Sequence, residues 1–526
     1  MFDNEKLNKQ SSTPISGQNI VATSQPLAVK AGIDILQNGG NAVDAAIASA
    51  ITLTVVEPTN NGIGGDAFAI IWDRDKLYGL NGSGKSPKKW SYEKFAHRKE
   101  MPKEGWDSVT VPGAVSVWVE LSRTFGKLEF SKLFESAIHY ASSGFKVTPK
   151  TALLWKLAQE RFKDYPNYVK TFLVDGQSPK ASELFKCPKQ AKTLKEIAST
   201  NGKSLYQGEL AKKIASCAAE EGGLLTLDDL KTHKPFWVEP ISVRYRDYEI
   251  WELPPNGQGL AALVALGILD YFDMSKYKLE SAESIHLQVE AMKIGFSVAK
   301  SIVADPDQIR DDIAKYLSPE FLNKMANEIY LDKANDVDIS YSKDKGTVYL
   351  TTADSNGMMV SYIQSNYMGF GSGVVIPGTG ISMQNRGFGF TTEKGHPNQV
   401  DGGKRPFHTI IPAFVTQNGK PVLSFGVMGG PMQPQGHVQM ITRIFDYNQN
   451  PQQVSNAPRW FITEENRLAV EPGFDDNVIS ELKNRGHNII TDLPERNFGG
   501  AQLIYKTDNG YIAGSDYRKD GLAAGF

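Results

Sequence analysis

The sequence predicts a mixed α/β fold, and three observations support that class. The chain of 526 residues is 40% hydrophobic and 22% charged, which is ordinary composition for a protein with a sizeable buried core. Helical spacing of apolar residues dominates as far as residue 346, and short segments typical of strands dominate from Thr347 onward. No internal repeat, low-complexity run or Ser/Pro-rich linker interrupts the chain, so we expect one continuous unit.

The first two helices are predicted from their ends. Pro26 lies in the first turn of one helix, which Gly39-Gly40 ends because glycine tolerates the left-handed conformation that follows a helix. Asn41 and Asp44 then form a capping-box pattern for a second helix, Ala42–Val56. This second helix is small and apolar nearly all round, so we expect it to be buried.

The remaining elements follow from the spacing of apolar residues. We expect further helices at Ala114–Phe125, Ser131–Ala141, Leu260–Phe272, Ala282–Ala299 and Gln433–Tyr447. We expect strands at Phe68–Asp73, Thr347–Ala353, Met358–Gln364, Ile410–Val415, Pro421–Phe425, Leu468–Glu471, His487–Thr491, Ala501–Tyr505 and Tyr511–Gly514. Asp354–Gly357 contains Asn-Gly and is predicted to be a turn between two of these strands. Residues 303–346 are polar and charged, which predicts an exposed loop.

Composition excludes several classes of partner. Lys and Arg (57) nearly balance Asp and Glu (59), so no basic excess is available to bind nucleic acid. No apolar segment reaches the ~18 residues that span a bilayer, and residues 1–19 lack the apolar core of a secretory signal. We therefore expect no membrane partner and a cytoplasmic location. Cys187 and Cys217 are expected to be reduced structural thiols, although one bridge between them stays open.

Common metal, cofactor and nucleophile motifs do not occur in the sequence. The eight histidines form neither HExxH nor a Cys/His zinc spacing, so we expect no metal. No GxSxG nucleophile elbow and no phosphate-binding GxxxxGKS/T loop is present, and Gly62–Gly65 does not match GxGxxG. We therefore expect no cofactor.

Thr347 stands where a charged stretch meets a predicted strand. A cut between Gly346 and Thr347 would give Thr347 a free α-amine. A hydroxyl is a weak nucleophile at neutral pH and needs an adjacent base, and an α-amine with a pKa of about 7.7–8 is partly neutral at pH 7. Thr347 would then supply nucleophile and base together. The same hydroxyl is suited to attack the Gly346 carbonyl, because glycine tolerates the strained backbone that such an attack needs.

A second feature is the glycine pair Gly429-Gly430, which lies between a predicted strand and a predicted helix. Consecutive backbone N–H groups at such a turn are well placed to hold a developing oxyanion. Glycine pairs at strand–helix turns and Gly-Thr steps before strands are also ordinary structural features. Neither one identifies an enzyme by itself.

Longer motifs extend over nearly the whole chain. They are Val21–Thr23, Asn38–Ala46, Glu57-Pro58, Gly62–Asp66, Val111–Gly113, Leu253–Gly259, Glu290–Lys293, Lys404–Pro406, Met428–Gly430, Asn456–Arg459 and Gly514–Asp516. Together, and in this order, they resemble the γ-glutamyltranspeptidase family.

The resemblance implies a fold and a mechanism. Family members are N-terminal-nucleophile hydrolases, so we expect an αββα sandwich of two stacked, mainly antiparallel sheets flanked by helices. The precursor is expected to cut itself into a large chain, 1–346, and a small chain, 347–526, which stay together as one intertwined domain. Thr347 would attack the amide carbonyl of a small-molecule γ-glutamyl donor such as glutathione. The acyl-enzyme would then pass its acyl group to water or to an amino acid.

The resemblance also implies roles for single residues. Ser365 takes the place of a hydroxyl beside the nucleophile, and Gly429-Gly430 matches the oxyanion hole. Asp354 and Gly357, in the turn after the first strand of the small chain, are expected to help to place Thr347.

Four departures from the family pattern bear on the substrate. The small chain begins Thr347–Tyr349 instead of Thr-Thr-His, and no Arg precedes Pro87, where the family binds the substrate α-carboxylate. Phe388-Gly389 replaces the acidic pair that holds the α-amine. His408-Thr409 replaces a pair of serines, and Tyr367 replaces an asparagine. Losing one partner of a buried charged pair costs about 2–5 kcal/mol, so we expect glutathione to be a poor substrate.

The residues around these positions resemble the cephalosporin- or glutaryl-acylase-like branch. Arg386 is predicted to bind a distal carboxylate of the acyl group, or else to lie in a solvated loop or an internal salt bridge. His408 is predicted to donate to the acyl chain, or else to be satisfied within the fold. Tyr367 is predicted to wall the pocket or to hydrogen-bond the nucleophile, or else to pack. Thr409 is predicted to bind substrate beside them.

Three hypotheses follow. The first is a self-processing γ-glutamyltransferase-like amidase or acyltransferase with Thr347 as nucleophile, within which γ-glutamyl activity and acylase-type activity both stay open. The second is an unprocessed or inactive binding homologue. The third is an unrelated α/β protein in which Thr347 is only a strand residue.

Overall fold

Two stacked sheets form the centre of the computed structural model, which describes residues 12–336 and 346–526. The first sheet has the order β1 (Ile15–Gly17), β20 (Gly510–Ser515), β19 (Gly500–Thr507), β15 (Lys420–Met428), β14 (Ala413–Gln417), β9 (Tyr248–Glu252) and β8 (Ile241–Tyr245). The second has the order β21 (Leu522–Gly525), β2 (Ile20–Thr23), β10 (Gly346–Ala353), β11 (Met359–Tyr367), β3 (Asp66–Asp73), β4 (Lys76–Asn81) and β7 (Phe236–Val238). Neighbouring strands are antiparallel in both sheets.

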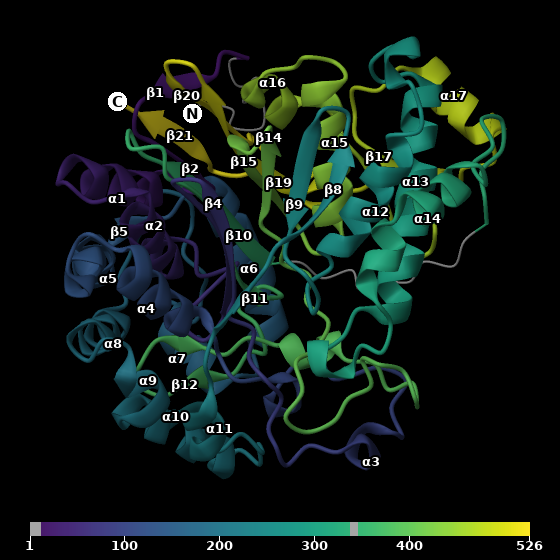
Figure 1. The fold of residues 1–526 in the computed structure, drawn as a ribbon. Helices are drawn as coiled ribbons and strands as arrows, with labels where there is room; N and C mark the ends of the chain where they lie inside the picture. Colours follow the sequence, from purple (N-terminus) through teal and green to yellow (C-terminus); the bar gives the residue numbers. More distant parts are fainter. Residues whose placement is uncertain (1–11, 337–345) are drawn as a thin grey trace.

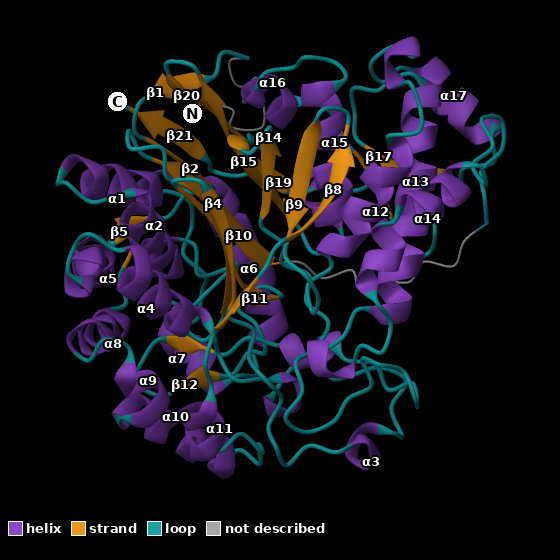
Figure 2. Ribbon diagram, in the orientation of Figure 1, coloured by secondary structure: helices purple, strands orange, loops and turns teal. Residues whose placement is uncertain are grey.

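Helices cover the outer face of each sheet (Figure 1). On the second sheet lie α1 (Pro26–Gln37), α2 (Ala42–Val56) and α4 (Ala114–Phe125), with α5 (Glu135–Ser143) packed against α2. On the first sheet lie α12 (Gly259–Leu269) and α15 (Met432–Phe445), with α13 (Ala282–Ile302) packed against α12. Figure 2 shows the strands of both sheets between these two groups of helices. This order of layers confirms the expected αββα sandwich.

The other elements surround this sandwich. The helices are α3 (Tyr92–Phe95), α6 (Pro149–Phe162), α7 (Pro166–Phe172), α8 (Pro188–Ser199), α9 (Lys203–Gln207), α10 (Glu209–Glu220), α11 (Leu227–Thr232), α14 (Pro319–Ala326), α16 (Pro451–Asn456) and α17 (Asp476–Asn484). The 3₁₀ turns are η2 (Trp106–Ser108), η3 (Phe130–Phe134), η4 (Met274–Lys276), η5 (Pro306–Gln308), η6 (Ile313–Leu317), η7 (Arg386–Gly389) and η8 (Glu495–Phe498). Short strands are β5 (Phe145–Lys146), β6 (Leu184–Phe185), β12 (Val375–Ile376), β13 (Ile381–Ser382), β16 (Trp460–Ile462), β17 (Leu468–Val470) and β18 (Ile489–Ile490).

The two sheets face each other across an apolar layer. Phe68, Tyr349, Ile363, Phe414 and Ile504 are fully buried in it, and they come from five strands of the two sheets. Because interior packing is dense, this layer holds β10 of the second sheet in a fixed position over β15 of the first. The ends of those two strands carry the residues that the sequence singles out for catalysis.

The predicted ends of the first two helices agree with the structure. The helix α1 begins at Pro26, and the Gln25 side chain caps it by accepting from the N–H of Leu27 at 2.6 Å. Asn41 and Asp44 form the expected capping box of α2, all of which is buried. The apolar periodicity and the capping residues were sufficient to predict these helix ends, because both act within one turn of helix.

The interpretation of residues 303–346 as an exposed loop is wrong for much of the part that the structure describes. Residues 303–336 contain η5, η6 and the helix α14, and residues 337–345 lie outside the described ranges. Leu322 and Ala326 of α14 are buried in the same apolar cluster as α12. The helix has only eight residues and lies within a charged stretch, so its apolar face was hidden in the composition of the whole segment.

Residues on both sides of the 346/347 boundary build each sheet. In the first sheet β8 and β9 precede the boundary and pair with β14, which follows it. In the second sheet β10 and β11 follow the boundary and lie between β2 and β3, which precede it. A cut at this point would therefore divide the sequence without dividing either sheet.

Two further expectations concern cysteines and membranes. Cys187 and Cys217 are both free and buried, as expected of structural thiols, and they form no bridge. Among the helices of the described residues, none is both long enough and apolar enough to cross a membrane.

Candidate active site

Thr347 lies at the start of β10, in the middle of the second sheet, and is 2% exposed. Gly346 pairs with Tyr367 of β11 and Val348 pairs with Gln364, so the register shifts at Thr347. Ser365 and Asn366 of β11 therefore lie opposite Thr347 alone, and such a bulge leaves one residue of the longer strand unpaired and bends that strand. Tyr367 itself has a φ of 76°, a left-handed backbone that is costly for a large side chain. The ladder is thus irregular on β11 at this position.

Ser365 connects the Thr347 hydroxyl to the carbonyl of the preceding residue. The Thr347 hydroxyl donates to Ser365 Oγ at 3.2 Å, and the Ser365 hydroxyl donates to the Gly346 carbonyl oxygen at 2.6 Å. The Tyr367 N–H donates to the same Ser365 oxygen at 2.7 Å. Ser365 is fully buried, so these contacts form away from bulk water. A hydroxyl that donates to a carbonyl oxygen polarises the carbonyl for attack at its carbon.

Glycine is required at position 346 by close packing. A Cβ there would lie 2.8 Å from the Gly369 nitrogen and 2.9 Å from the Met368 carbonyl carbon. The backbone of Gly346 does not adopt the left-handed conformation, so the reason differs from the backbone strain inferred from the sequence. Absence of a side chain lets the residue 368–369 backbone approach the Gly346–Thr347 bond.

Asp354 and Gly357 do not place Thr347 directly. They lie in the turn beyond the far end of β10, where the Asp354 carboxylate accepts from the Ala42 N–H at 2.8 Å and so holds the start of α2. Thr351, the next threonine along β10, exchanges a hydrogen bond of 2.7 Å with Ser424 of β15. Asp354 and Thr351 therefore stabilise the fold around β10 and do not contact the end of the strand that carries Thr347.

Gly429 and Gly430 form the turn between β15 and α15. Their φ angles are 129° and 60°, conformations that favour glycine. Within the described residues, no hydrogen-bond acceptor is paired with either N–H. The turn lies at the N-terminus of α15, where the helix dipole favours negative charge. These features are what an oxyanion hole requires.

A cavity of about 400 Å³ contains Thr347. Gly346, Gly369 and Gly429 line it beside Thr347, so the hydroxyl and the first of the two glycines open into one space. Most of the remaining wall comes from α6, η8 and the residues between β20 and β21, and Thr59 and Asn60 after α2 also line it.

A second cavity, of about 560 Å³, contains Tyr367 and Thr409. Phe388 and Gly389, at the positions where the family pattern has an acidic pair, also line it, as does Pro431 next to Gly430. Since Tyr367 pairs with Gly346 and Pro431 follows the glycine turn, the two cavities flank the same catalytic end of β10.

Arg386 lies behind the second cavity and is fully buried. Its Nη1 donates to Thr409 Oγ1 at 2.8 Å, and its guanidinium lies 4.5 Å from the centre of the Tyr367 ring. Nε and Nη2 have no hydrogen-bond partner within the described residues. Burial lowers the pKa of Arg386 to about 10, which still leaves the group charged at neutral pH. The structure therefore brings three predicted residues together and leaves a buried cation with two unused donors.

His408 is also fully buried and pairs with Asp66. Its Nε2 lies 3.1 Å from Asp66 Oδ2, and its Nδ1 has no partner within the described residues. Burial raises the pKa of Asp66 to about 7, although the charge of Arg386 opposes this. Burial and the same arginine hold the pKa of His408 well below its usual range, so the imidazole is neutral. The group of Arg386, His408 and Asp66 therefore carries a net positive charge whenever Asp66 is protonated.

Gln258 is a residue that sequence reasoning did not single out. Its Nε2 donates to the Thr409 carbonyl at 2.6 Å and to the Gly430 carbonyl at 3.0 Å, so it ties the glycine turn to the wall of the second cavity. Gln258 and Asp66 both lie in motifs that carry the family resemblance, which was the available signal. The residues of α6 that line the Thr347 cavity lie in no such motif.

A polar cluster outside both cavities contains possible metal ligands. His286, Glu290 and His487 have ligand atoms within 4.8 Å of one another. His286 and His487 hydrogen-bond at 2.7 Å, and the Lys293 ammonium donates to Glu290 at 2.8 Å. Because these groups hydrogen-bond to one another, the cluster is explained as buried polar packing.

Comparisons with known proteins describe what this chain is similar to. A family model described as gamma-glutamyltranspeptidase matches residues 28–526. Among solved structures, the cephalosporin acylase from Bacillus halodurans is 44% identical with a TM-score of 0.95, over 100% of this chain and 99% of that one. The glutathione hydrolase-like YwrD proenzyme of Bacillus subtilis (strain 168) is 35% identical over 97% of this chain and 99% of its own length. The oxamate amidohydrolase proenzyme of Klebsiella pneumoniae is 34% identical over 98% and 100%.

Proposed function

Because the chain belongs to the γ-glutamyltranspeptidase family, we propose that it is a self-processing amidohydrolase whose nucleophile is Thr347. The family is one of N-terminal-nucleophile enzymes, and the two relatives above have the word proenzyme in their names. The hydroxyl chain from Thr347 through Ser365 to Gly346 supports processing at this bond.

Processing begins with attack of Thr347 Oγ on the Gly346 carbonyl carbon. The Ser365 hydroxyl donates to the oxygen on which negative charge develops, and the C–N bond breaks as the Thr347 nitrogen takes a proton. Water then hydrolyses the resulting ester. The products are a carboxylate at Gly346 and a free α-amine and hydroxyl on Thr347.

Replacing Ser365 tests this step. Ser365→Ala removes the donor to the Gly346 carbonyl, and we expect processing to slow by about 10²–10³-fold, as for loss of one oxyanion donor. Ser365→Thr keeps the hydroxyl and is expected to process within about tenfold of the wild-type rate. The half-time for conversion of full-length chain to two fragments measures both. Equal half-times for Ser365→Ala and wild type would contradict the role of Ser365.

Turnover then uses the new α-amine as base. It takes the proton from Thr347 Oγ as the oxygen attacks a substrate amide, and the Gly429 and Gly430 N–H groups stabilise the oxyanion. The C–N bond breaks, the amine takes the proton and leaves, and the acyl group remains on Thr347 as an ester. Water releases it as a carboxylic acid, or an amino acid accepts it as a new amide.

The choice of substrate rests on the burial of the Arg386 guanidinium with unused donors. Its Nε and Nη2 are two parallel donors of the kind that bind a carboxylate, beside a neutral imidazole with an unused Nδ1. An acyl group with a distal carboxylate, held in the cavity with Tyr367 and Thr409, would satisfy them. The likeness to a protein named as a cephalosporin acylase supports an acylase-type substrate.

A γ-glutamyl substrate fits the second cavity less well. Its α-ammonium needs an anion, and Phe388 and Gly389 line the cavity where the family pattern has an acidic pair. Because one relative is named as glutathione hydrolase-like, hydrolysis of γ-glutamyl amides is the second candidate activity.

A substrate panel decides between the two. We expect processed enzyme to hydrolyse glutaryl p-nitroanilide with a kcat/KM at least about tenfold above that for γ-glutamyl p-nitroanilide, since Phe388 and Gly389 stand where the family pattern has the acidic pair that holds the ammonium. Release of p-nitroaniline measures both under identical conditions. A clear preference for the γ-glutamyl compound would overturn the carboxyacyl assignment and leave the nucleophile assignment intact.

A further inference from the structure

Asp66 and His408 form a buried pair of an acid and an imidazole in the neighbourhood of Arg386. Asp66 is the first residue of β3, and His408 lies in the segment before β14. Both side chains are fully buried, and Asp66 Oδ2 lies 3.1 Å from His408 Nε2. Within the described residues, His408 Nδ1 has no hydrogen-bond partner. Neither residue takes part in the attack by Thr347.

One proton decides between two forms of this pair. Asp66 Oδ1 accepts from the Gly113 N–H at 2.9 Å, so an added proton is held on Oδ2, which faces His408 Nε2. With Asp66 ionised, Nε2 carries the imidazole hydrogen and donates it to Oδ2, and Nδ1 is a bare acceptor. With Asp66 protonated, the Oδ2 hydroxyl donates to Nε2, and the neutral imidazole carries its hydrogen on Nδ1. A proton that arrives at Nδ1 is therefore stored at Asp66.

Arg386 brings a positive charge to this pair. Burial raises the pKa of Asp66 to about 7, and the charge of Arg386 opposes the rise. Burial also holds the pKa of His408 well below its usual range, and Arg386 lowers it further, so the imidazole is neutral in both forms. In the part of the chain that the structure describes, Arg386 contacts no carboxylate directly, since Nη1 donates to Thr409 and the other two nitrogens have no partner. An ionised Asp66 therefore balances the charge of Arg386 from a distance.

Two further titratable groups near Asp66 keep a constant charge. Arg405 also acts on Asp66, but it has carboxylates of its own in Asp305 and Asp307. The Tyr206 phenol is affected by the Asp66 charge, and burial raises the pKa of Tyr206, so this group stays neutral. Arg386 is thus the cation whose balance changes when Asp66 takes up or loses a proton.

A substrate carboxylate bound at Arg386 would compete with ionised Asp66 for the same positive charge. Like charges near each other disfavour ionisation, so one of the two carboxyl groups is expected to take up a proton. A carboxylate of a glutaryl group has an ordinary pKa of about 4.3 and stays ionised at neutral pH. Burial has already raised the pKa of Asp66, so Asp66 is the group that takes the proton. By linkage, the substrate carboxylate binds most tightly when Asp66 already holds it.

We propose that Asp66 is a positioning residue that couples binding of a carboxyacyl substrate to uptake of one proton from solvent. The proton enters at His408 Nδ1, the imidazole passes its Nε2 hydrogen to Asp66 Oδ2, and the charge of Arg386 is freed for the substrate. Asp66 acts through Arg386 and does not touch the reacting atoms. This rests on the proposed function, in which the distal carboxylate lies against Arg386. An acyl group without that carboxylate binds with no such uptake.

The pH dependence of a substrate preference tests the coupling. The measurement is the ratio of kcat/KM for glutaryl p-nitroanilide to kcat/KM for butyryl p-nitroanilide, from about pH 5.5 to about pH 8.5. We expect the ratio to be highest at acid pH and to fall about tenfold through one titration near pH 7, as ionised Asp66 repels the substrate carboxylate. The α-amine of Thr347 also titrates in this range, but it serves both substrates alike and cancels in the ratio.

Asp66→Asn fixes the protonated form. Its Oδ1 keeps the Gly113 N–H, so its amide nitrogen faces His408 Nε2 and leaves the imidazole hydrogen on Nδ1. We expect a ratio that is high and constant over the whole pH range. Glu252→Gln is the matched control, because Glu252 pairs with His437 at 2.5 Å in another fully buried acid and imidazole pair and lines neither cavity. It should keep the wild-type pH profile.

Proton uptake gives a readout that does not depend on turnover. Calorimetry of glutarate binding to processed enzyme at about pH 7.5, in buffers that differ in ionisation enthalpy, measures the number of protons taken up. We expect wild type to take up about half a proton more with glutarate than with butyrate, because Asp66 is then mostly ionised before binding. In Asp66→Asn this difference should vanish.

Failure of the inference is distinct from failure of the proposed function. A wild-type ratio that is flat or rises with pH overturns the inference, and so does equal proton uptake with glutarate and butyrate. A wild-type profile that persists in Asp66→Asn also overturns it. The two wild-type measurements decide the question even if Asp66→Asn does not process. Absence of any amide turnover by fully processed enzyme overturns the proposed function and this inference with it.

Discussion

Replacing Thr347 with alanine is expected to leave the 57.9-kDa chain in one piece and to abolish amide turnover. The methyl group that remains has no lone pair, so neither the Gly346 carbonyl nor a substrate amide meets a nucleophile. The wild-type chain is expected to give fragments of about 38 and 20 kDa, in proportion to 346 and 180 of its 526 residues. Denaturing gels measure the first effect. Amide hydrolysis measures the second, with an expected loss of about 10³-fold or more.

Thr347→Ser is the matched control. It retains a hydroxyl at the start of β10, opposite the bulge of β11, so processing should continue, although more slowly. N-terminal sequencing of the small wild-type fragment should read Thr-Val-Tyr-Leu, the residues from 347 to 350. A wild-type protein that hydrolyses amides as a single uncut chain would contradict the mechanism. A wild-type chain that neither cuts itself nor turns over amides would favour the binding homologue instead.

Replacing Arg386 with methionine is expected to lower kcat/KM for glutaryl p-nitroanilide by about 10²-fold, the effect of removing one partner of a buried charged pair. Hydrolysis of butyryl p-nitroanilide, which has no distal carboxylate, should change much less. The ratio of the two values is the measurement, because it separates loss of carboxylate binding from a general loss of structure. Methionine keeps an unbranched apolar side chain in place of the arginine stem and removes the charge.

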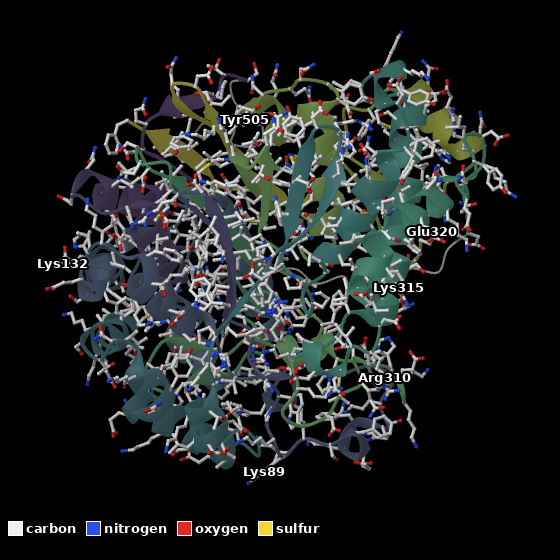
Figure 3. The ribbon with its side chains drawn as sticks, viewed as in Figure 1. Lys89, Lys132, Arg310, Lys315, Glu320 and Tyr505 are labelled. Atoms are coloured by element: carbon white, nitrogen blue, oxygen red, sulfur yellow. The ribbon has the colours of Figure 1, made fainter. Side chains whose placement is uncertain are left out.

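Two further variants sharpen this result. Arg386→Lys keeps the charge but cannot donate in parallel from two nitrogens, so we expect it to recover only part of the ratio. Arg310→Met is the control, since Arg310, labelled in Figure 3, is exposed and lines neither of the two cavities beside Thr347 and Tyr367. If Arg386→Met lowers both substrates equally, Arg386 serves the fold and the carboxylate is bound elsewhere.

Much of the fold and of the catalytic end of β10 was predictable because it depends on local rules. The capping box of Asn41 and Asp44 acts within one helical turn, and it appears as expected. Thr347 and Ser365 lie on adjacent strands joined by one short turn, so their approach follows from antiparallel pairing. The glycine turn at 429–430 follows a strand and precedes a helix, which the sequence pattern also indicated.

Other predictions failed or stayed incomplete where distant segments meet. The amphipathic α14 was hidden in a charged stretch, because only its contact with α12 shows which face is buried. Asp354 was expected from the family resemblance to help to place Thr347, whereas an extended strand carries it to the opposite end of β10. Asp66 and His408 are 342 residues apart, and no spacing rule connects them.

The sequence by itself determined the family and the layered architecture and supplied Thr347 as the candidate nucleophile, because short motifs and local periodicity are properties of neighbouring residues. Only the tertiary structure decided that Arg386 is buried with unused donors and that Asp66 and His408 form a buried pair near it. Burial, charge neutralisation and cavity shape depend on which segments pack together in space. They are therefore set by the assembled fold and not by any single stretch of chain.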